Sequence, residues 1–153
     1  MESSRRRKAL NLFWHAGRIA LAAIFLFAGV AKLRDPYAFA TAIEHYRIIG
    51  ASASLVLAFV LPWIEILCSL ALLSQRLVRG GLLLSLMLST LFVAVLSSAL
   101  VRGLDISCGC FGSGNSTAVW VALVRAILLL LVTLATTRIW YCRRSLTETL
   151  QTG

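Results

Sequence analysis

Four long apolar segments constrain the fold of this chain more than any other feature. They cover residues 12–33, 53–73, 80–101 and 118–140, and each is about the 20 residues that a helix needs to cross the hydrocarbon core of a bilayer. Segment 80–101 contains no Asp, Glu, Lys or Arg, whereas each of the others has one ionisable residue well inside it. We therefore predict an all-α integral membrane protein, a four-helix bundle with transmembrane helices at these positions.

The composition supports a membrane protein over a soluble one. Apolar residues make up 59% of the chain and charged residues 14%, against roughly 45–50% and 25% in soluble domains. A disordered chain is also excluded, because disorder needs low apolar content. We divide the 153 residues into a basic N-terminal tail at 1–11, a transmembrane domain at 12–141 and a C-terminal tail at 142–153.

The positive charge predicts how the bundle is oriented. The two chain ends and the loop after the second span hold nine Lys and Arg residues, and the other two loops hold four. Because short cytoplasmic loops retain positive charge, we expect a bacterial inner-membrane protein with both termini in the cytoplasm. The basic residues form no stripe with interleaved aromatics, so we expect no nucleic-acid partner. An alternative interpretation of the N-terminal segment is a cleavable signal peptide.

A short amphipathic helix is expected between the first two spans, on the periplasmic side. Asp35 is placed as an N-cap, Pro36 as the first helical residue and Gly50 as a stop. One face of this helix carries Phe39, Ile43 and Tyr46. Such a helix would rest on the membrane surface or on the bundle, either as a structural lid or as an element that docks a partner or gates access.

The loop between the third and fourth spans contains the most reactive residues. Cys108, Gly109 and Cys110 lie there among further glycines, so irregular backbone is expected to present the two thiols to a partner. The charge distribution places this loop in the periplasm, where disulfides persist. The other loop residues of interest are Arg102, Phe111 and Gly112.

Three interpretations of the cysteine pair remain open. A redox-active dithiol is favoured, because strained and exposed disulfides tend to be catalytic or regulatory. A static disulfide that closes the loop and a soft-metal site for Cu(I) are the alternatives, whereas zinc would need four ligands. The other two cysteines, Cys68 and Cys142, are distant in sequence, and we expect them to behave as small apolar residues.

Ionisable residues inside the spans form the second candidate site. Glu65 follows Pro62 near the middle of the second span, where a bare carboxylate is costly. Arg125 lies in the outer half of the fourth span, Arg18 approaches from the inner side, and Lys32 sits near the outer edge. These residues predict either an ion pair or triad that joins spans one, two and four, or a proton or quinone-headgroup site beneath the cysteine loop.

An ordered set of short motifs resembles one family of membrane proteins. The set comprises Arg18, residues 27–36, Tyr46-Arg47, residues 61–65, Arg102-Gly103, residues 108–112 and Arg125. Together these motifs are similar to those of the methylamine-utilisation MauE branch of the DoxX-like membrane proteins. The resemblance extends over about residues 15 to 140.

The resemblance implies a four-helix inner-membrane protein associated with thiol redox chemistry and a periplasmic thioredoxin-like protein or disulfide-containing client. In methylamine utilisation, family members are needed for maturation of the disulfide-rich small subunit of methylamine dehydrogenase. Carried over to this chain, Cys108 and Cys110 would be the catalytic pair, and Glu65 and Arg125 the intramembrane polar pair. The chain would be a thiol-disulfide oxidoreductase or a subunit of a quinone-linked system. No cofactor is evident, although DoxX relatives suggest a quinone.

Overall fold

Five α-helices account for nearly all of the described chain. The computed structural model describes residues 2–46, 48, 50–102 and 119–151. The helices are α1 (Glu2–Arg34), α2 (Pro36–His45), α3 (Ala51–Leu73), α4 (Val78–Val101) and α5 (Val119–Gln151). Four of them are long and apolar enough to cross a membrane, so the predicted fold class is confirmed. Helices α1 and α5 extend beyond the apolar segments into both predicted tails.

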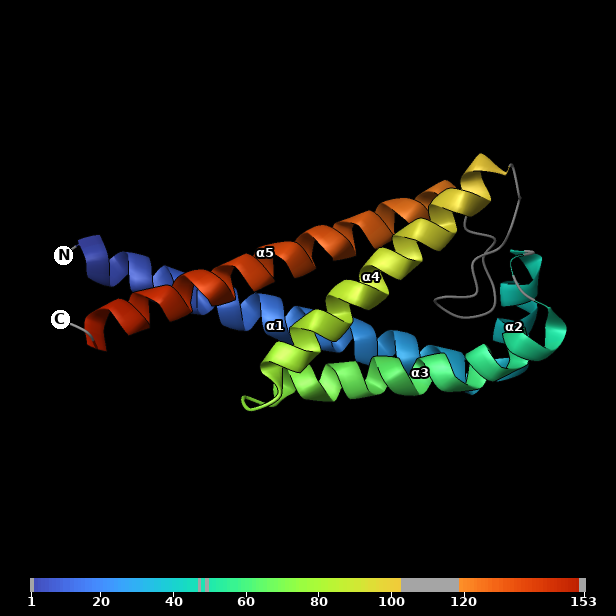
Figure 1. The fold of residues 1–153 in the computed structure, drawn as a ribbon, viewed down its shortest axis with the longest axis horizontal. Coiled ribbons are helices and arrows are strands. Elements are labelled where there is room, and N and C mark those ends of the chain that lie inside the picture. Colours follow the sequence, from blue (N-terminus) through green and yellow to red (C-terminus); the bar gives the residue numbers. More distant parts are fainter. Residues whose placement is uncertain (1, 47, 49, 103–118, 152–153) are drawn as a thin grey trace.

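The four long helices form a ring in which each packs on two neighbours. The contacts run from α1 to α3, from α3 to α4, from α4 to α5 and from α5 back to α1. Within the described residues, the backbones of the diagonal pairs α1–α4 and α3–α5 do not come close to each other, and only side chains meet across the ring. Helix α2 lies across one end, against α3 and α1, and both chain termini lie at the other end (Figure 1).

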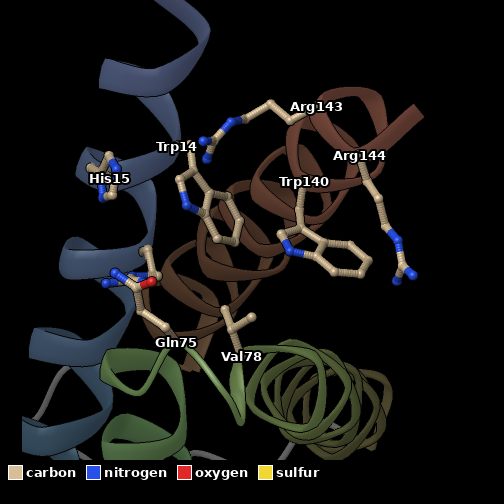
Figure 2. Close-up of a pocket in the computed structure, with 8 residues that line it drawn as sticks. Trp14, His15, Gln75, Val78, Trp140, Arg143 and Arg144 are labelled. Atoms are coloured by element: carbon tan, nitrogen blue, oxygen red, sulfur yellow. The ribbon is translucent and has the colours of Figure 1, made fainter. Parts of the chain in front are cut away.

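A cavity of about 340 Å³ opens at the end of the bundle that holds the termini. Helices α1 and α5, the short α3–α4 connection and the first residue of α4 form its walls (Figure 2). Two tryptophans, Trp14 and Trp140, face each other across this space, with Val78 below them. The cavity therefore lies between helices that are far apart in the sequence.

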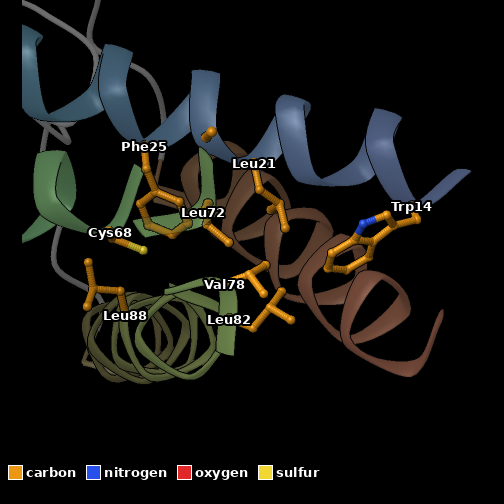
Figure 3. Packing of buried hydrophobic residues seen from close by; sticks show 9 residues of the cluster. Trp14, Leu21, Phe25, Cys68, Leu72, Val78, Leu82 and Leu88 are labelled. Carbon is orange, nitrogen blue, oxygen red and sulfur yellow. The ribbon is translucent and has the colours of Figure 1, made fainter. Parts of the chain in front are cut away.

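One apolar core cluster occupies the half of the bundle between this cavity and the middle of the helices, and two smaller clusters lie toward the α2 end. The buried side chains of the first cluster come from α1, α3 and α4 (Figure 3), and they are Trp14, Leu21, Ala22, Phe25, Cys68, Leu72, Val78, Leu82 and Leu88. The thiol of Cys68 lies 3.6 Å from the carbonyl oxygen of Gly81, to which it donates. A Cβ on Gly81 would lie 2.8 Å from the backbone nitrogen of Leu72, so glycine is what allows α3 and α4 to approach here.

Small polar side chains are buried in this bundle, while large apolar side chains cover its outside. Ser54, Ser69, Ser85, Ser89, Thr133 and Thr136 are buried, whereas Leu83 and Met87 of α4 are 60% and 69% exposed. Ser69 donates across to the carbonyl oxygen of Ala22 at 2.8 Å. This distribution is typical of helices that pack within lipid, because small residues allow close approach and lipid solvates the apolar exterior.

Candidate functional site

A buried ion pair between α1 and α3 is the centre of the candidate site. Lys32 of α1 donates through Nζ to Oε1 of Glu65 of α3. The two side chains are 1% and 0% exposed. Both groups are therefore fully removed from solvent. In the low-dielectric interior of the bundle, each charge depends on the other for stabilisation.

Two phenylalanine rings complete the surroundings of the Lys32 ammonium group. Nζ lies 4.8 Å from the ring centre of Phe92 of α4 and 5.2 Å from that of Phe39 of α2. A cation near aromatic ring faces within about 6 Å is attracted by the negative charge of those faces. The single ammonium group thus contacts α2, α3 and α4, although it is carried by α1.

Helix α2 covers the ion pair because its apolar face is turned onto the bundle. Phe39 and Ala40 are buried and pack with Ala58 of α3, and Ile43 packs against this group. The Asp35 side chain accepts from the backbone nitrogen of Ala38 at 2.9 Å, so the predicted N-cap is confirmed. The helix ends at His45, earlier than the predicted stop at Gly50.

Close backbone approach on the α3 side allows Lys32 to reach Glu65. A Cβ on Gly29 would lie 2.9 Å from the carbonyl oxygen of Pro62 and 3.4 Å from Cβ of Glu65. Glycine at this position therefore brings α1 directly against the turn of α3 that carries the carboxylate. Within the described residues, Oε2 of Glu65 is buried without a hydrogen-bond partner.

The predicted pairing of Glu65 with Arg125 is wrong. Within the described residues, Lys32 is the cation in the salt bridge to Glu65, and Arg125 lies exposed on α5. The physical reason is the ring order, in which α3 and α5 occupy diagonal positions and their backbones are not in contact, whereas α1 lies directly against α3. The ion pair therefore joins spans one and two, without span four.

Arg18 also lies away from the Glu65 carboxylate. It lines the cavity at the terminal end of the bundle, where its guanidinium carbon is 6.0 Å from the ring centre of Trp14. The predicted triad is therefore replaced by a pair, and Arg18 belongs to a separate cluster.

The candidate cysteines and their loop residues lie outside the described part of the chain. This applies to Cys108, Gly109, Cys110, Phe111 and Gly112. The described flanks of that segment are Arg102 and Val119, at the end of the bundle where α2 lies (Figure 1). Arg102 donates through Nη1 to the carbonyl oxygen of Tyr46 at 3.0 Å, which ties the end of α4 to the end of α2.

The other two cysteines lie in different surroundings in the described structure. Cys68 is buried in the apolar core, and Cys142 is exposed near the end of the span in α5. In the described part of the chain, no three His, Cys, Asp or Glu side chains gather in a way that could hold a metal ion.

Two features were not predicted from the sequence, namely the contact of Phe92 with Lys32 and the cluster of Trp and Arg residues at the terminal end. A signal for the second was present, because Trp14 and Arg18 on α1 and Trp140 and Arg144 on α5 are each spaced by four residues. Residues at this spacing lie on one helical face. No comparable signal marks Phe92, because its contact crosses a diagonal of the ring.

The fold and the site define an integral membrane four-helix bundle with a buried Lys–Glu pair beneath a short capping helix. The family model described as methylamine utilisation protein MauE matches residues 10–140. A curated relative, methylamine utilization protein MauE of Paracoccus denitrificans, is 32% identical over 120 residues, which cover 77% of this chain and 64% of that protein. The chain belongs to the MauE family, as its motifs predicted.

Two further findings set the scale of this similarity. The chain spans just under two thirds of the length of the Paracoccus relative. No solved structure matches it.

Proposed function

We propose that this protein supports disulfide formation or maturation of a client protein outside the cytoplasm, through the thiols of Cys108 and Cys110. The observation that carries the proposal is the Cys-Gly-Cys sequence between two apolar helices, α4 ending at Val101 and α5 beginning at Val119. Its relative is named for methylamine utilisation, which supports a client in that process. Maturation of the small subunit of methylamine dehydrogenase is the corresponding reaction.

The proposed chemistry is a thiol–disulfide exchange. A client thiolate attacks one sulfur of the oxidised Cys108–Cys110 pair and forms a mixed disulfide, releasing the other cysteine as a thiolate. A second client thiolate then attacks the mixed disulfide, so that the client leaves with a disulfide. Two electrons and two protons pass from the client to the pair, and a thioredoxin-like disulfide or a membrane quinone accepts them when the pair is reoxidised.

The bundle acts in this proposal as a rigid support for the reactive segment. The Lys32–Glu65 pair and the ring of Phe92 connect three helices beneath α2, and Arg102 connects α4 to the end of α2. Precise positioning of reacting groups can contribute several kcal/mol to a rate. These contacts inside the bundle and at its end therefore hold the flanks of the Cys108–Cys110 segment without taking part in the exchange.

We also propose that both termini lie in the cytoplasm and that the cysteine pair lies in the periplasm. The excess of Lys and Arg at the chain ends and in the α3–α4 connection supports this orientation. Both termini lie at one end of the bundle, as four spans require (Figure 1).

Thiol labelling of intact spheroplasts tests sidedness and redox state together. The protein carries Cys142→Ser, and Cys68 is buried, so a membrane-impermeant maleimide reports on Cys108 and Cys110. We expect little labelling before mild reduction and two labels per chain after it. Labelling that requires lysis places the pair in the cytoplasm and refutes the proposal.

A trapping experiment tests the exchange itself. In the Cys142→Ser background, the variants Cys108→Ser and Cys110→Ser are each mixed with a thioredoxin-like protein. That protein has a single active-site cysteine, whose sulfur is activated as a mixed disulfide with a small leaving group. We expect one of the two variants to form a stable mixed disulfide, and the matched double variant Cys108→Ser/Cys110→Ser to form none. Full client maturation by Cys110→Ser at a normal protein level would instead indicate a structural disulfide, and stoichiometric Cu(I) bound by the reduced pair would indicate a metal site.

A further inference from the structure

The cavity at the terminal end of the bundle has the composition of an anion-binding site. The side chains that line it come from α1, the α3–α4 connection, the start of α4 and α5 (Figure 2), and they are Trp14, His15, Arg18, Gln75, Val78, Trp140, Arg143 and Arg144. Three of the eight are arginines, and none of these described lining residues is Asp or Glu. Positive charge is therefore concentrated in one concave space.

Arg18 provides the most specific indication of a ligand. Its Nε is buried and has no hydrogen-bond partner within the described residues, although the residue lines the cavity. A buried donor that lacks a partner destabilises the folded protein, because it has lost its hydrogen bonds to water. An acceptor bound in the cavity would replace those hydrogen bonds, and a charged oxygen would do so most effectively.

The two tryptophans orient the guanidinium groups. Arg18 and Arg143 lie 6.0 and 5.7 Å from the ring centre of Trp14, and Arg144 lies 5.7 Å from that of Trp140. A ring attracts the face of a guanidinium group, whereas its N–H groups lie in the plane and can still donate. Paired N–H donors of this kind match the oxygens of a phosphate.

The position of the cavity along the helices points to the lipid headgroup region. The candidate spans of α1 and α5 are Ala9–Arg34 and Trp120–Arg144, so the α5 lining residues lie at the end of their span and the α1 lining residues lie within the first ten residues of theirs. Two large apolar side chains close in sequence to lining residues are exposed, Leu12 at 70% and Leu77 at 62%, and these would contact acyl chains. Basic pockets between transmembrane helices are known to bind phospholipid headgroups.

We propose that this cavity binds a phosphate group, supplied by the headgroup of an anionic phospholipid or as free phosphate. The volume of about 340 Å³ is at the lower end of the range for small-ligand sites and suits a headgroup without its acyl chains. Arg18 donates from within, and Arg143 and Arg144 donate from α5. The site is independent of the cysteine chemistry, so either proposal can fail without the other.

Tryptophan fluorescence of the purified full-length protein in detergent tests this binding. The protein is titrated separately with dihexanoyl phosphatidylglycerol, with dihexanoyl phosphatidylcholine and with inorganic phosphate. We expect a saturable change with phosphatidylglycerol, and a Kd raised about tenfold or more in Arg18→Gln, because hydrogen bonds to charged groups are worth about 1.5–3 kcal/mol. The matched control is Arg76→Gln, which removes the same charge from the neighbouring connection outside the cavity and should leave Kd within about twofold.

The outcomes separate the two sources of phosphate. Saturation by phosphatidylglycerol but by neither phosphatidylcholine nor inorganic phosphate assigns the site to an anionic lipid. Saturation by inorganic phosphate over the same concentration range, lost in Arg18→Gln, assigns it to the free anion. If circular dichroism shows that Arg18→Gln has lost helix, Arg143→Gln at the half-buried rim replaces it. Absence of a saturable change with every ligand, or an equal loss of affinity in Arg76→Gln, overturns the proposal.

Discussion

Replacing Glu65 by leucine should destabilise the bundle strongly, because it leaves the Lys32 ammonium group buried without its counterion. Leucine fills much of the volume of the glutamate, so the perturbation is chiefly electrostatic. The Lys32 side chain is 1% exposed and α2 covers it, so water cannot replace the carboxylate. The two phenyl rings remain in the variant and offset only part of the loss.

The magnitude follows from the burial of both partners. Removing one member of a buried ion pair costs about 3–5 kcal/mol, whereas replacing both by apolar residues is often neutral or stabilising. At roughly 2–4 °C per kcal/mol for a chain of this size, Glu65→Leu should lower the apparent Tm by about 6 °C or more. The double variant Lys32→Met/Glu65→Leu should recover most of that loss.

Thermal unfolding followed by circular dichroism in detergent, at one fixed scan rate, measures these differences. Glu44→Leu is the matched control, since it removes one carboxylate from α2, outside the predicted spans, and should change Tm by no more than about 2 °C. The reasoning is refuted if Glu65→Leu has the same apparent Tm as the wild type. It is also refuted if the double variant is as unstable as Glu65→Leu, because the loss would then not come from an orphaned charge.

Two further predictions concern helix packing and the aromatic contact, and both use the same melting assay. Gly81→Ala should lower Tm by about 2 °C or more, because its Cβ would lie 2.8 Å from the backbone of α3. The control is Gly80→Ala, whose Cβ would have nothing within 4 Å and which should leave Tm unchanged or raise it. Equal Tm changes in the two variants would contradict the close approach of α3 and α4 at Gly81. Phe92→Leu should lower the free energy of unfolding by about 1–2 kcal/mol, whereas Phe13→Leu, at an exposed position, should have a smaller effect. If Phe92→Leu destabilises the Lys32→Met variant by the same amount as the wild type, a cation–π contribution is excluded.

Local sequence patterns were sufficient to predict the helices and the cap. Apolar length predicted the four spans, because a bilayer requires about 20 such residues in a row. Asp35 followed by proline predicted where α2 begins, since a side-chain oxygen one residue before a helix accepts from its first turn. The apolar face of α2 was also predicted correctly, and it packs onto α3.

The partner of Glu65 could not be predicted in the same way. The estimated depths of the side chains in the membrane favoured Arg125 as the partner of Glu65, because counting residues along a helix gives depth but not which helices are neighbours. The ring order places α5 diagonally from α3, and Gly29 brings α1 close enough for Lys32 to reach the carboxylate. Counting residues along each span does not reveal which helices become neighbours.

The amino-acid sequence alone determined that this chain spans a membrane, where each span lies and to which family its motifs belong. These properties depend on residues that are close together in the chain and on the lipid bilayer as its solvent. The tertiary structure decided that Lys32 neutralises Glu65, that Phe92 contacts the same ammonium group, and that three arginines meet two tryptophans around one cavity. Such contacts depend on the order in which helices pack, which is set by side-chain volume and close approach between distant segments.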